Sequence, residues 1–222
     1  NYYGNNNLSD YGYGGTFAVT GGIYTSKPAD KYIVTGYKTI AADNLYYVLP
    51  EVIANAAVAA NVTAVTESTA DVATALANNN GKATMFMWND VAYIAKYGEV
   101  VITSAADEAT TVRGVVESAA GLTSATVAEG VEVVGERTFR RCANLETVAL
   151  PNTLTEIGPA VFQSCSRLAN VTIPASVTTI GEGAFRDSDL FHIDIPGSVT
   201  QIHPDAFYNC QSLREIVFEP SP

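Results

Sequence analysis

Basic residues are scarce in this chain of 222 residues, which has 12 Lys and Arg against 23 Asp and Glu and a formal net charge of −11. The acidity is spread over both halves, and no cluster of Lys and Arg offers a local exception. A phosphate backbone or an anionic membrane surface would therefore be repelled along the whole length. We expect no nucleic-acid partner.

Long apolar runs are missing as well. The most apolar window, residues 48–65, is interrupted by Pro50, Glu51, Asn55 and Asn61, so we expect no membrane span. The chain starts at Asn1 without Met, signal peptide or transit peptide, which is typical of a processed mature product or of a trimmed chain.

Cysteine and histidine are rare, with three Cys and two His. Three cysteines are too few for a disulfide framework, and they lack the paired short spacing of a zinc site. No Ser, Cys or His has credible partners for a catalytic triad. We therefore predict no catalytic residue, no cofactor and no metal site, and we expect a protein that is not an enzyme.

Two weaker metal or acid/base patterns have plainer explanations. His192 and Asp194 lie two apart on an expected strand and project from one face, but the neighbouring rows offer no third ligand. Asp187 and Asp189 offer calcium-like oxygens without the ligand spacing of a calcium loop. We interpret all four as surface residues.

Residues 1–30 form an N-terminal arm rich in Asn, Tyr and Gly, which lacks the aliphatic density for a core of its own. We interpret the arm as flexible or peripherally packed. Alternatively, residues 16–19 and 22–25 pair as strands with another sheet, since extended segments readily complete open sheet edges.

Residues 31–121 mix helix and strand signals and predict a small α+β module. We expect strands over residues 31–40 and 99–104. We also expect a helix over residues 68–81 and a hairpin over residues 82–97. Ser104, with Asp107 and Glu108, predicts a further helix through about Ala120. All five lysines lie at or before Lys96 and every later basic residue is arginine, which favours separate modules.

From residue 122 onward the sequence repeats. Phenylalanine recurs at steps of 23, 23 and 22 residues, and leucine, proline and glycine keep the same register. The columns are Phe139, Phe162, Phe185 and Phe207; Leu145, Leu168, Leu190 and Leu213; Pro151, Pro174 and Pro196; and Gly135, Gly158 and Gly181. About twenty residues cannot close a globule, so each copy buries its apolar face against its neighbours. Residues 122–222 therefore predict a solenoid of about four coils.

These repeats resemble the BspA-type leucine-rich repeat family over about residues 122–219. The resemblance rests on the recurring Ile-Pro, Val-x-x-Ile-Gly and Ala-Phe steps and on the Cys and Leu columns. It departs at Ser188, which replaces Cys, at His203, which replaces Gly, and in a third copy that is one residue short between Phe185 and Leu190. The family is found in surface and secreted proteins. The resemblance implies a parallel sheet on one face of a curved stack, and adhesion or protein interaction at the cell surface or outside the cell instead of catalysis.

The outward rows of the expected sheet are the candidate partner-binding residues. Strand alternation places every second side chain on the outside. The candidates are Thr147, Asn170, His192, Glu215, Phe191, Asp194 and Arg214. Phe191 is the sole aromatic anchor among them, so the rows predict a protein or other macromolecular partner only modestly.

The cysteines Cys142, Cys165 and Cys210 share one repeat position, with Ser188 in the third copy. We interpret them as small buried side chains that line the coil. Cys142 and Cys165 lie in adjacent copies about 5 Å apart, which leaves a disulfide between them open. Cys210 has no adjacent cysteine and is expected to stay free.

The last copy ends one strand into a further coil and leaves Ile216 and Phe218 poorly covered. An alternative function is therefore a self-assembling structural subunit, in which an arm or module of another copy covers this end in a filament or surface layer. The expected assembly residues are Tyr2, Tyr3, Tyr11, Tyr13, Phe17, Ile216 and Phe218.

Overall fold

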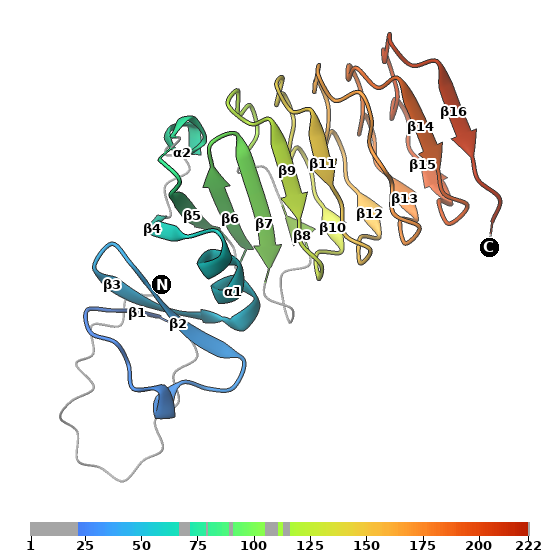
Figure 1. The fold of residues 1–222 in the computed structure, drawn as a ribbon. Helices are drawn as coiled ribbons and strands as arrows, with labels where there is room; N and C mark the ends of the chain where they lie inside the picture. Colours follow the sequence, from blue (N-terminus) through green and yellow to red (C-terminus); the bar gives the residue numbers. More distant parts are fainter. Residues whose placement is uncertain are drawn as a thin grey trace.

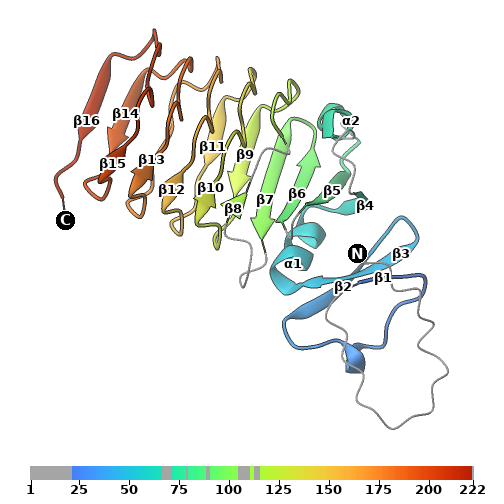
Figure 2. The same cartoon turned by 180° about the vertical axis from the view of Figure 1, so that it is seen from behind.

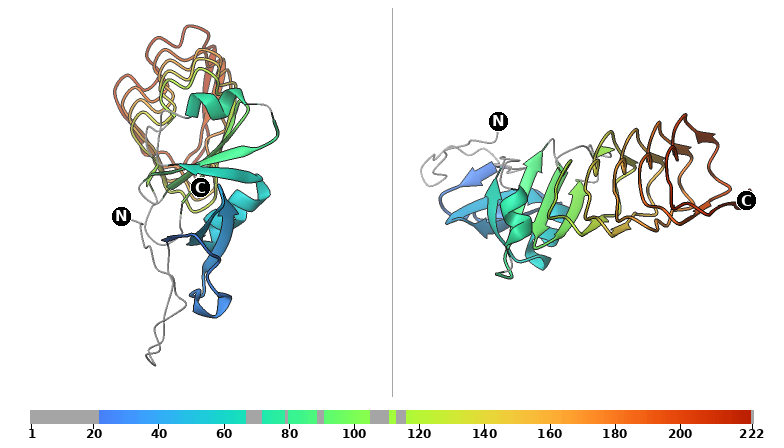
Figure 3. Two further views of the ribbon diagram at one scale, coloured as in Figure 1. Left: turned by 90° about the vertical axis from the view of Figure 1, so that its left-hand side faces the viewer. Right: turned by 90° about the horizontal axis from the view of Figure 1, so that it is seen from above.

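The fold, taken from a computed structural model, is a β-solenoid with a layered N-terminal region attached to one end (Figure 1). The structure describes residues 22–66, 72–78, 80–88, 91–104, 111–112 and 116–221. The coils follow one another away from the N-terminal region, and they overlay when the molecule is viewed along the stack (Figure 3). The predicted solenoid with a parallel sheet is confirmed, and the predicted N-terminal α+β region is supported in part.

A six-stranded sheet runs from the N-terminal region into the solenoid in the order β11-β9-β7-β6-β5-β4. Its strands are β4 (Val62–Thr66), β5 (Ala83–Trp88), β6 (Val91–Lys96), β7 (Glu99–Ser104), β9 (Ser124–Val127) and β11 (Thr147–Ala149). The strands β5, β6 and β7 are antiparallel neighbours, whereas β7 pairs with β9 in parallel, with Val101 opposite Thr126. The first coil thus continues the sheet of the N-terminal region (Figure 2).

Apolar side chains cover this sheet differently on its two faces. On one face Phe86, Tyr93, Val100 and Ile102 belong to a core that continues through every coil of the solenoid. Helix α2 (Val72–Ala77) contributes Ala75 and Leu76 to the same core. Strand alternation sends the intervening residues to the other face, where Met85, Ala92 and Ile94 belong to a second core.

The second core is closed by helix α1 (Glu51–Ala59) and a three-stranded antiparallel sheet. The sheet has the order β1-β3-β2, formed by β1 (Gly22–Tyr24), β2 (Tyr37–Ala42) and β3 (Leu45–Pro50), and a 3₁₀ turn, η1 (Asp30–Tyr32), precedes β2. Ile53, Ala54 and Ala57 place one buried side of α1 against this core. Helix α1 therefore covers only the part of the six-stranded sheet that lies in the N-terminal region (Figure 1).

A second parallel sheet follows the opposite side of the coils in the order β15-β13-β12-β10-β8. Its strands are two residues long: β8 (Thr111–Val112), β10 (Val133–Val134), β12 (Glu156–Ile157), β13 (Thr179–Ile180) and β15 (Gln201–Ile202). The last coils add a separate two-stranded parallel sheet, formed by β14 (His192–Ile195) and β16 (Glu215–Phe218). Among the described residues, 170–173 carry no strand assignment although the repeat predicts one.

The repeated phenylalanines stand in one stack inside the solenoid. Neighbouring ring centroids lie 5.5, 5.3 and 5.4 Å apart from Phe139 to Phe207, and the ring planes differ by 17° at most. Phe139, Phe162 and Phe185 are fully buried, whereas Phe207 in the last coil is partly exposed. The spacing matches the distance between paired strands, so one ring per coil fills the core without a gap.

The glycine column before each phenylalanine is required by the close approach of successive coils. A Cβ on Gly181 would lie 2.6 Å from the carbonyl carbon of Gly158, and one on Gly158 would lie 2.8 Å from the oxygen of Val134. Each glycine N–H donates to the preceding coil at 2.7 Å, and His203 in the last coil does so at 2.9 Å. The last coil carries a side chain at this position, and its hydrogen bond to the preceding coil is the longest of the four.

The structure of the N-terminal half differs locally from what its sequence predicts. The helix expected from Ser104 to about Ala120 is wrong, because Thr111–Val112 form β8 and residues 116–118 form a turn of the first coil. Helix α1 was not expected, because residues 48–65 were considered only as an apolar window. The strand expected over residues 31–40 begins at Tyr37. The hairpin of β5 and β6 is confirmed, although its turn lies outside the described residues, as does Ser68.

The division of the chain at residues 30 and 121 stays a prediction about independently folding parts. Within the arm, Gly22–Tyr24 pair with β3 and Asp30 begins η1, whereas residues 1–21 lie outside the described residues. The solenoid core also includes side chains from before residue 121, such as Phe86 and Tyr93.

Candidate functional site

The candidate site is the outer surface of the coils that begins on β9 and β11 of the six-stranded sheet and continues over residues 170–172 to the separate two-stranded sheet of β14 and β16; we call it the outward face. It comprises the exposed side chains of β9, β11, residues 170–172, β14 and β16. The pairing of β14 with β16 sets His192 opposite Glu215 and Asp194 opposite Val217, as the repeat register predicts. Ile193 and Ile195 point inward to the core, so the alternation of the strand places His192 and Asp194 outside.

His192 lies between two carboxylates on this face. Its Nε2 is 2.9 Å from Asp194 Oδ1, and its Nδ1 is 3.3 Å from Glu215 Oε2. A neutral imidazole donates from one ring nitrogen, whereas the imidazolium donates from both. The two carboxylates are more than half exposed, so water screens these pairs and they hold side-chain positions more than they stabilise the fold.

Two apolar side chains are exposed in the same coils: Val217, opposite Asp194, and Phe191, directly before β14. Phe191 is 55% exposed and Val217 is 37% exposed. The Arg214 N–H donates to the Phe191 carbonyl at 2.9 Å, which fixes the backbone of the last two coils at this point. Exposed apolar side chains next to charged ones are typical of the anchor and rim of an interaction surface.

Small polar side chains cover the rest of the outward face. Thr147, Asn170 and Thr172 are exposed, and Ser124 and Thr126 continue the two rows toward the N-terminal region. At the margin, Arg167 and Glu146 form an exposed ion pair at 3.1 Å. Short side chains leave the surface accessible to a partner's backbone as well as to its side chains.

The outward face begins where α1 and the three-stranded sheet stop covering the six-stranded sheet. On β7, Val101 points to this side and packs against the core closed by α1. On β9, its neighbour Thr126 points to the same side and is exposed. The boundary between the covered and bare parts of one sheet therefore lies between β7 and β9. The sequence carries no local signal of this boundary beyond the change from valine to threonine.

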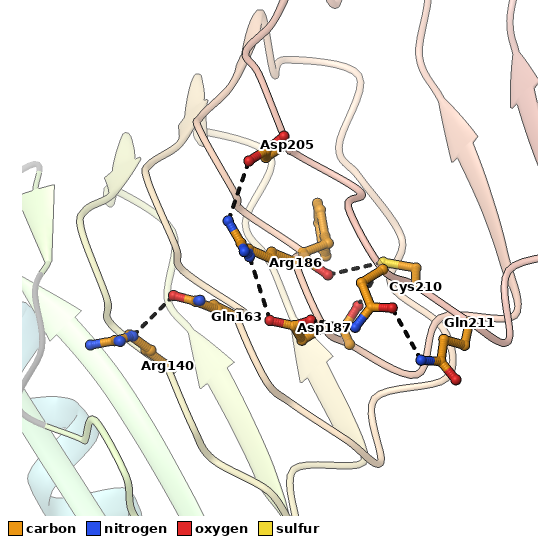
Figure 4. Close-up of polar contacts among 10 residues, drawn as sticks. Arg140, Gln163, Arg186, Asp187, Asp205, Cys210 and Gln211 are labelled. Atoms are coloured by element: carbon orange, nitrogen blue, oxygen red, sulfur yellow. Dashed lines mark hydrogen bonds and ion pairs between the residues drawn. The ribbon is translucent and has the colours of Figure 1, made fainter.

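A polar ladder follows the phenylalanine column along another side of the coils (Figure 4). Arg140 bonds Glu117 and Gln163, each at 3.0 Å, and so links three successive coils. Arg186 pairs with Asp187 and Asp205, at 3.5 and 3.2 Å, and its guanidinium lies 4.6 Å from the centre of the Tyr208 ring. All these charges have partners within the solenoid, which makes this side structural. The repeat analysis missed this column, although its members directly follow the phenylalanine position.

The cysteine position is structural as well. All three cysteines are free, which excludes the disulfide between Cys142 and Cys165 in this structure and agrees with the expectation for Cys210. Each thiol donates to a carbonyl of the preceding coil: Cys142 to Val116, Cys165 to Phe139 and Cys210 to Phe185, at 3.0, 3.1 and 3.0 Å. Burial raises the pKa of Cys142 to about 12 and that of Cys165 further, so both stay protonated. The bond to Val116 also shows that the coils begin earlier than residue 122.

The remaining candidate residues have defined places where the structure describes them. Ile216 and Phe218 on β16 are 37% and 67% exposed, at the far end of the stack. Tyr2, Tyr3, Tyr11, Tyr13 and Phe17 lie outside the described residues. Asp187 accepts a bond from Asn209 at 2.7 Å and Asp189 accepts one from Ser212. Within the described ranges no three His, Cys, Asp or Glu side chains converge as metal ligands, and no helix is long and apolar enough to cross a membrane.

Comparison with known families gives one match. Residues 116–221 match the model of the BspA type leucine rich repeat region in six copies. The resemblance read from the repeat columns is confirmed, and the match begins six residues before the predicted start. Comparison with curated proteins gives no match.

Several solved structures are similar to this chain. A leucine-rich repeat protein from Bacteroides ovatus is 25% identical with a TM-score of 0.47, and the match covers 61% of this chain and 41% of that one. A T. pallidum leucine rich repeat protein is 21% identical with a TM-score of 0.47, and the match covers 63% of this chain and 70% of that one. A leucine rich cell surface protein from Faecalibacterium prausnitzii is 19% identical with a TM-score of 0.38, covering 61% and 55%. The matched part is thus less than half the length of the Bacteroides ovatus protein.

Proposed function

Residues 116–221 are a BspA-type leucine-rich repeat region, and from this premise we propose that the chain is a non-enzymatic protein of the cell surface or extracellular space that binds another macromolecule through its outward face. Leucine-rich repeats of this type form a repeat fold for protein interaction. We propose adhesion as its role, the cell surface or extracellular space as its location and the outward face as its binding site.

The observation that carries the proposal is the bare face of a sheet that is covered elsewhere. In the N-terminal region both faces of the six-stranded sheet are buried, one by the solenoid core and one by α1 and the three-stranded sheet. In the solenoid the inner face alone is buried, and the outer residues Thr126, Thr147 and Thr172 are exposed. A long rigid surface of this kind is what repeat proteins use to bind partners.

The far end of the outward face offers the strongest contacts. Phe191 supplies an exposed aromatic ring, and Asp194 and Glu215 supply carboxylates held in place by His192. Aromatic anchors beside ordered polar groups carry most of the binding energy in protein interfaces. We therefore place the centre of the binding surface over β14 and β16, with Thr147 and Asn170 at its periphery.

A phage-displayed random peptide library tests the site. Peptides are selected against the 222-residue chain and then measured against a variant that carries Thr172→Arg and Asp194→Arg on the outward face. The matched control carries Thr155→Arg and Thr178→Arg at positions that are also exposed but lie next to the other sheet. We expect the outward-face variant to lose binding at least tenfold and the control to keep it. Equal binding to both variants would contradict the proposed site.

Self-assembly is the second candidate function, and the exposed end of the stack favours it. Ile202, Ile216 and Phe218 are exposed together in the last coil, and β16 has one neighbouring strand within the described chain. Strands with a free edge pair readily with other chains. The proposed assembly sets the N-terminal arm or module of another copy against this edge, which produces an open filament.

Sedimentation velocity of the 222-residue chain tests self-assembly. Species that grow with concentration and disappear in a chain lacking residues 1–26 support arm donation. Growth that persists without the arm but is lost with Ile216→Lys supports contact through the last coil alone. A monomer at all concentrations would contradict self-assembly and leave the binding proposal unaffected.

A further inference from the structure

Asn80 and Gly81 lie in the connection between α2 and β5. The pair Asn-Gly occurs once in the 222 residues. Asn80 is exposed, and nothing lies within 4 Å of the place where a Cβ on Gly81 would stand. The pair belongs to no strand and to no part of the outward face. Neither proposed function makes use of it.

The side chain of Asn80 is folded along the chain toward the residues that follow it. The N–H of Lys82 donates to Asn80 Oδ1 at 3.0 Å, so the side-chain amide spans Gly81. This N–H faces the oxygen on which negative charge develops when a nucleophile attacks the amide carbon, and such a donor stabilises the intermediate. The N–H of Gly81 makes no hydrogen bond to any described residue. Its nitrogen is therefore free to lose the proton and attack.

Two other exposed asparagines provide an internal comparison. Asn44 and Asn61 also lie in turns, with φ of 60° and 57°. They are followed by Leu45, the first residue of β3, and by Val62, the first residue of β4. Both of these residues carry a side chain beside the nitrogen and are held in a strand, whereas Gly81 has neither restriction. Attack by the following nitrogen is thus least hindered at Asn80.

We propose that Asn80 is a site of spontaneous covalent modification, in which its side-chain amide becomes aspartate or isoaspartate. The Gly81 nitrogen loses its proton to water or hydroxide and bonds to Asn80 Cγ. The Cγ–Nδ2 bond breaks, and Nδ2 takes a proton from water and leaves as ammonia. Water then opens the five-membered imide ring, at Cγ to give aspartate or at the main-chain carbonyl to give isoaspartate. One water is consumed, one ammonia is released, and nothing is oxidised or reduced.

The modification changes the charge and the path of the chain at this connection. Either product adds one negative charge, and isoaspartate also adds one carbon atom to the main chain between α2 and β5. Leu76 on α2 and Phe86 on β5 are buried in the solenoid core, whereas nothing packs against Gly81. We therefore expect both products to leave the core and the outward face in place.

Peptide mapping of the 222-residue chain by mass spectrometry tests the proposal. The chain is incubated at pH 8 in ¹⁸O-labelled water, and electron-transfer dissociation distinguishes aspartate from isoaspartate. We expect both products at position 80, each with one oxygen from the labelled water. They are expected to form at least roughly tenfold faster than any product at Asn44 or Asn61. The rate is expected to rise with pH, because the attacking nitrogen must be deprotonated.

Two variants and one peptide are the controls. Gly81→Ala places a methyl group beside the attacking nitrogen and is expected to slow the conversion at least roughly tenfold. Lys82→Ala keeps the N–H that bonds Asn80 Oδ1 and is the matched control, with an unchanged rate. A synthetic peptide of residues 76–86 gives the rate without the fold, and the native chain is expected to react within roughly tenfold of it. Circular dichroism checks that both variants fold.

Three results would overturn the proposal. They are a native chain that stays unmodified at position 80 while the peptide converts, formation of aspartate without isoaspartate, and a Gly81→Ala variant that converts as fast as the native chain. Each differs from failure of the outward face, because the peptide-library experiment uses positions in the coils, far along the chain from this connection.

Discussion

The N-terminal region and the solenoid differ in how they cover the two faces of their sheets. In the N-terminal region, Met85 and Ile94 on one face and Phe86 and Tyr93 on the other are all buried. In the solenoid, the inner residues Ile193 and Ile195 are buried and the outer residues are exposed. The solenoid stabilises itself by contacts between neighbouring coils and needs no second layer. Its outer face is therefore exposed, whereas both faces of the sheet in the N-terminal region are buried, one in the core shared with the solenoid and one in the second core.

The largest expected effect tests the core of the stack. Phe162→Ala removes a buried ring between two others and is expected to lower the free energy of unfolding by about 3–5 kcal/mol. Phe207→Ala, in the partly exposed last coil, is expected to cost about half as much, because less surface is buried there. Urea unfolding measures both. Equal losses would show that the last coil is as well covered as the central ones.

The close approach of the coils gives the next effect. Gly181→Ala places a Cβ against the backbone of Gly158 and is expected to cost about 1–3 kcal/mol through displacement of the coils. His203→Gly restores the glycine in the last coil and is expected to cost no more than about 1 kcal/mol, from backbone entropy alone. Thermal unfolding of both variants checks the difference. A neutral Gly181→Ala would mean that the coils lie further apart than described.

The buried thiols make stability depend on pH. Burial raises the pKa of Cys142 and Cys165 above the model-peptide value of 9.0. The folded state thus keeps protons that the unfolded state loses, and the free energy of unfolding falls as pH rises above about 9. We expect a loss of about 1 kcal/mol per thiol at about pH 10. Urea unfolding at pH 8 and 10 measures this loss. A Cys142→Ser, Cys165→Ser variant with the same loss would contradict the assignment.

The smallest expected effects compare the two parts of the outer sheet face. Val101 on β7 packs against the core closed by α1, whereas Val217 on β16 is 37% exposed. Val101→Ser is expected to lower the free energy of unfolding by about 1–2 kcal/mol. Val217→Ser is expected to change it by less than about 0.5 kcal/mol. Equal losses of unfolding free energy in urea would contradict the difference between a covered and a bare part of the outer face.

The repeat columns predicted the solenoid because its contacts recur at a fixed distance in the sequence. The register of His192 with Glu215 follows directly from the 23-residue step, as does the stack of phenylalanines. The first coil was missed because Val116 stands where later copies have phenylalanine. The signals at Ser104, Asp107 and Glu108 are typical of a helix start, but Val112, in the middle of the predicted helix, pairs with Val134 in a sheet.

The cover over the N-terminal end was not predictable for a different reason. Helix α1 meets the sheet through contacts between residues far apart in the sequence, such as Ile53 with the core around Met85 and Ile94. No periodic pattern encodes such contacts. The sequence pattern predicted which single residues point outward. It could not predict where the bare face begins, because that depends on the position of α1.

Accessibility along the outer face tests the central claim most directly. In a chain with Cys142, Cys165 and Cys210 changed to Ser or Ala, single cysteines at positions 101, 126 and 172 are reacted with a maleimide under native conditions. We predict that the thiols of Thr126→Cys and Thr172→Cys react at rates near those of an unfolded control, and that the thiol of Val101→Cys reacts at least tenfold more slowly. Slow reaction at position 172 would contradict a bare outward face and, with it, the proposed binding surface.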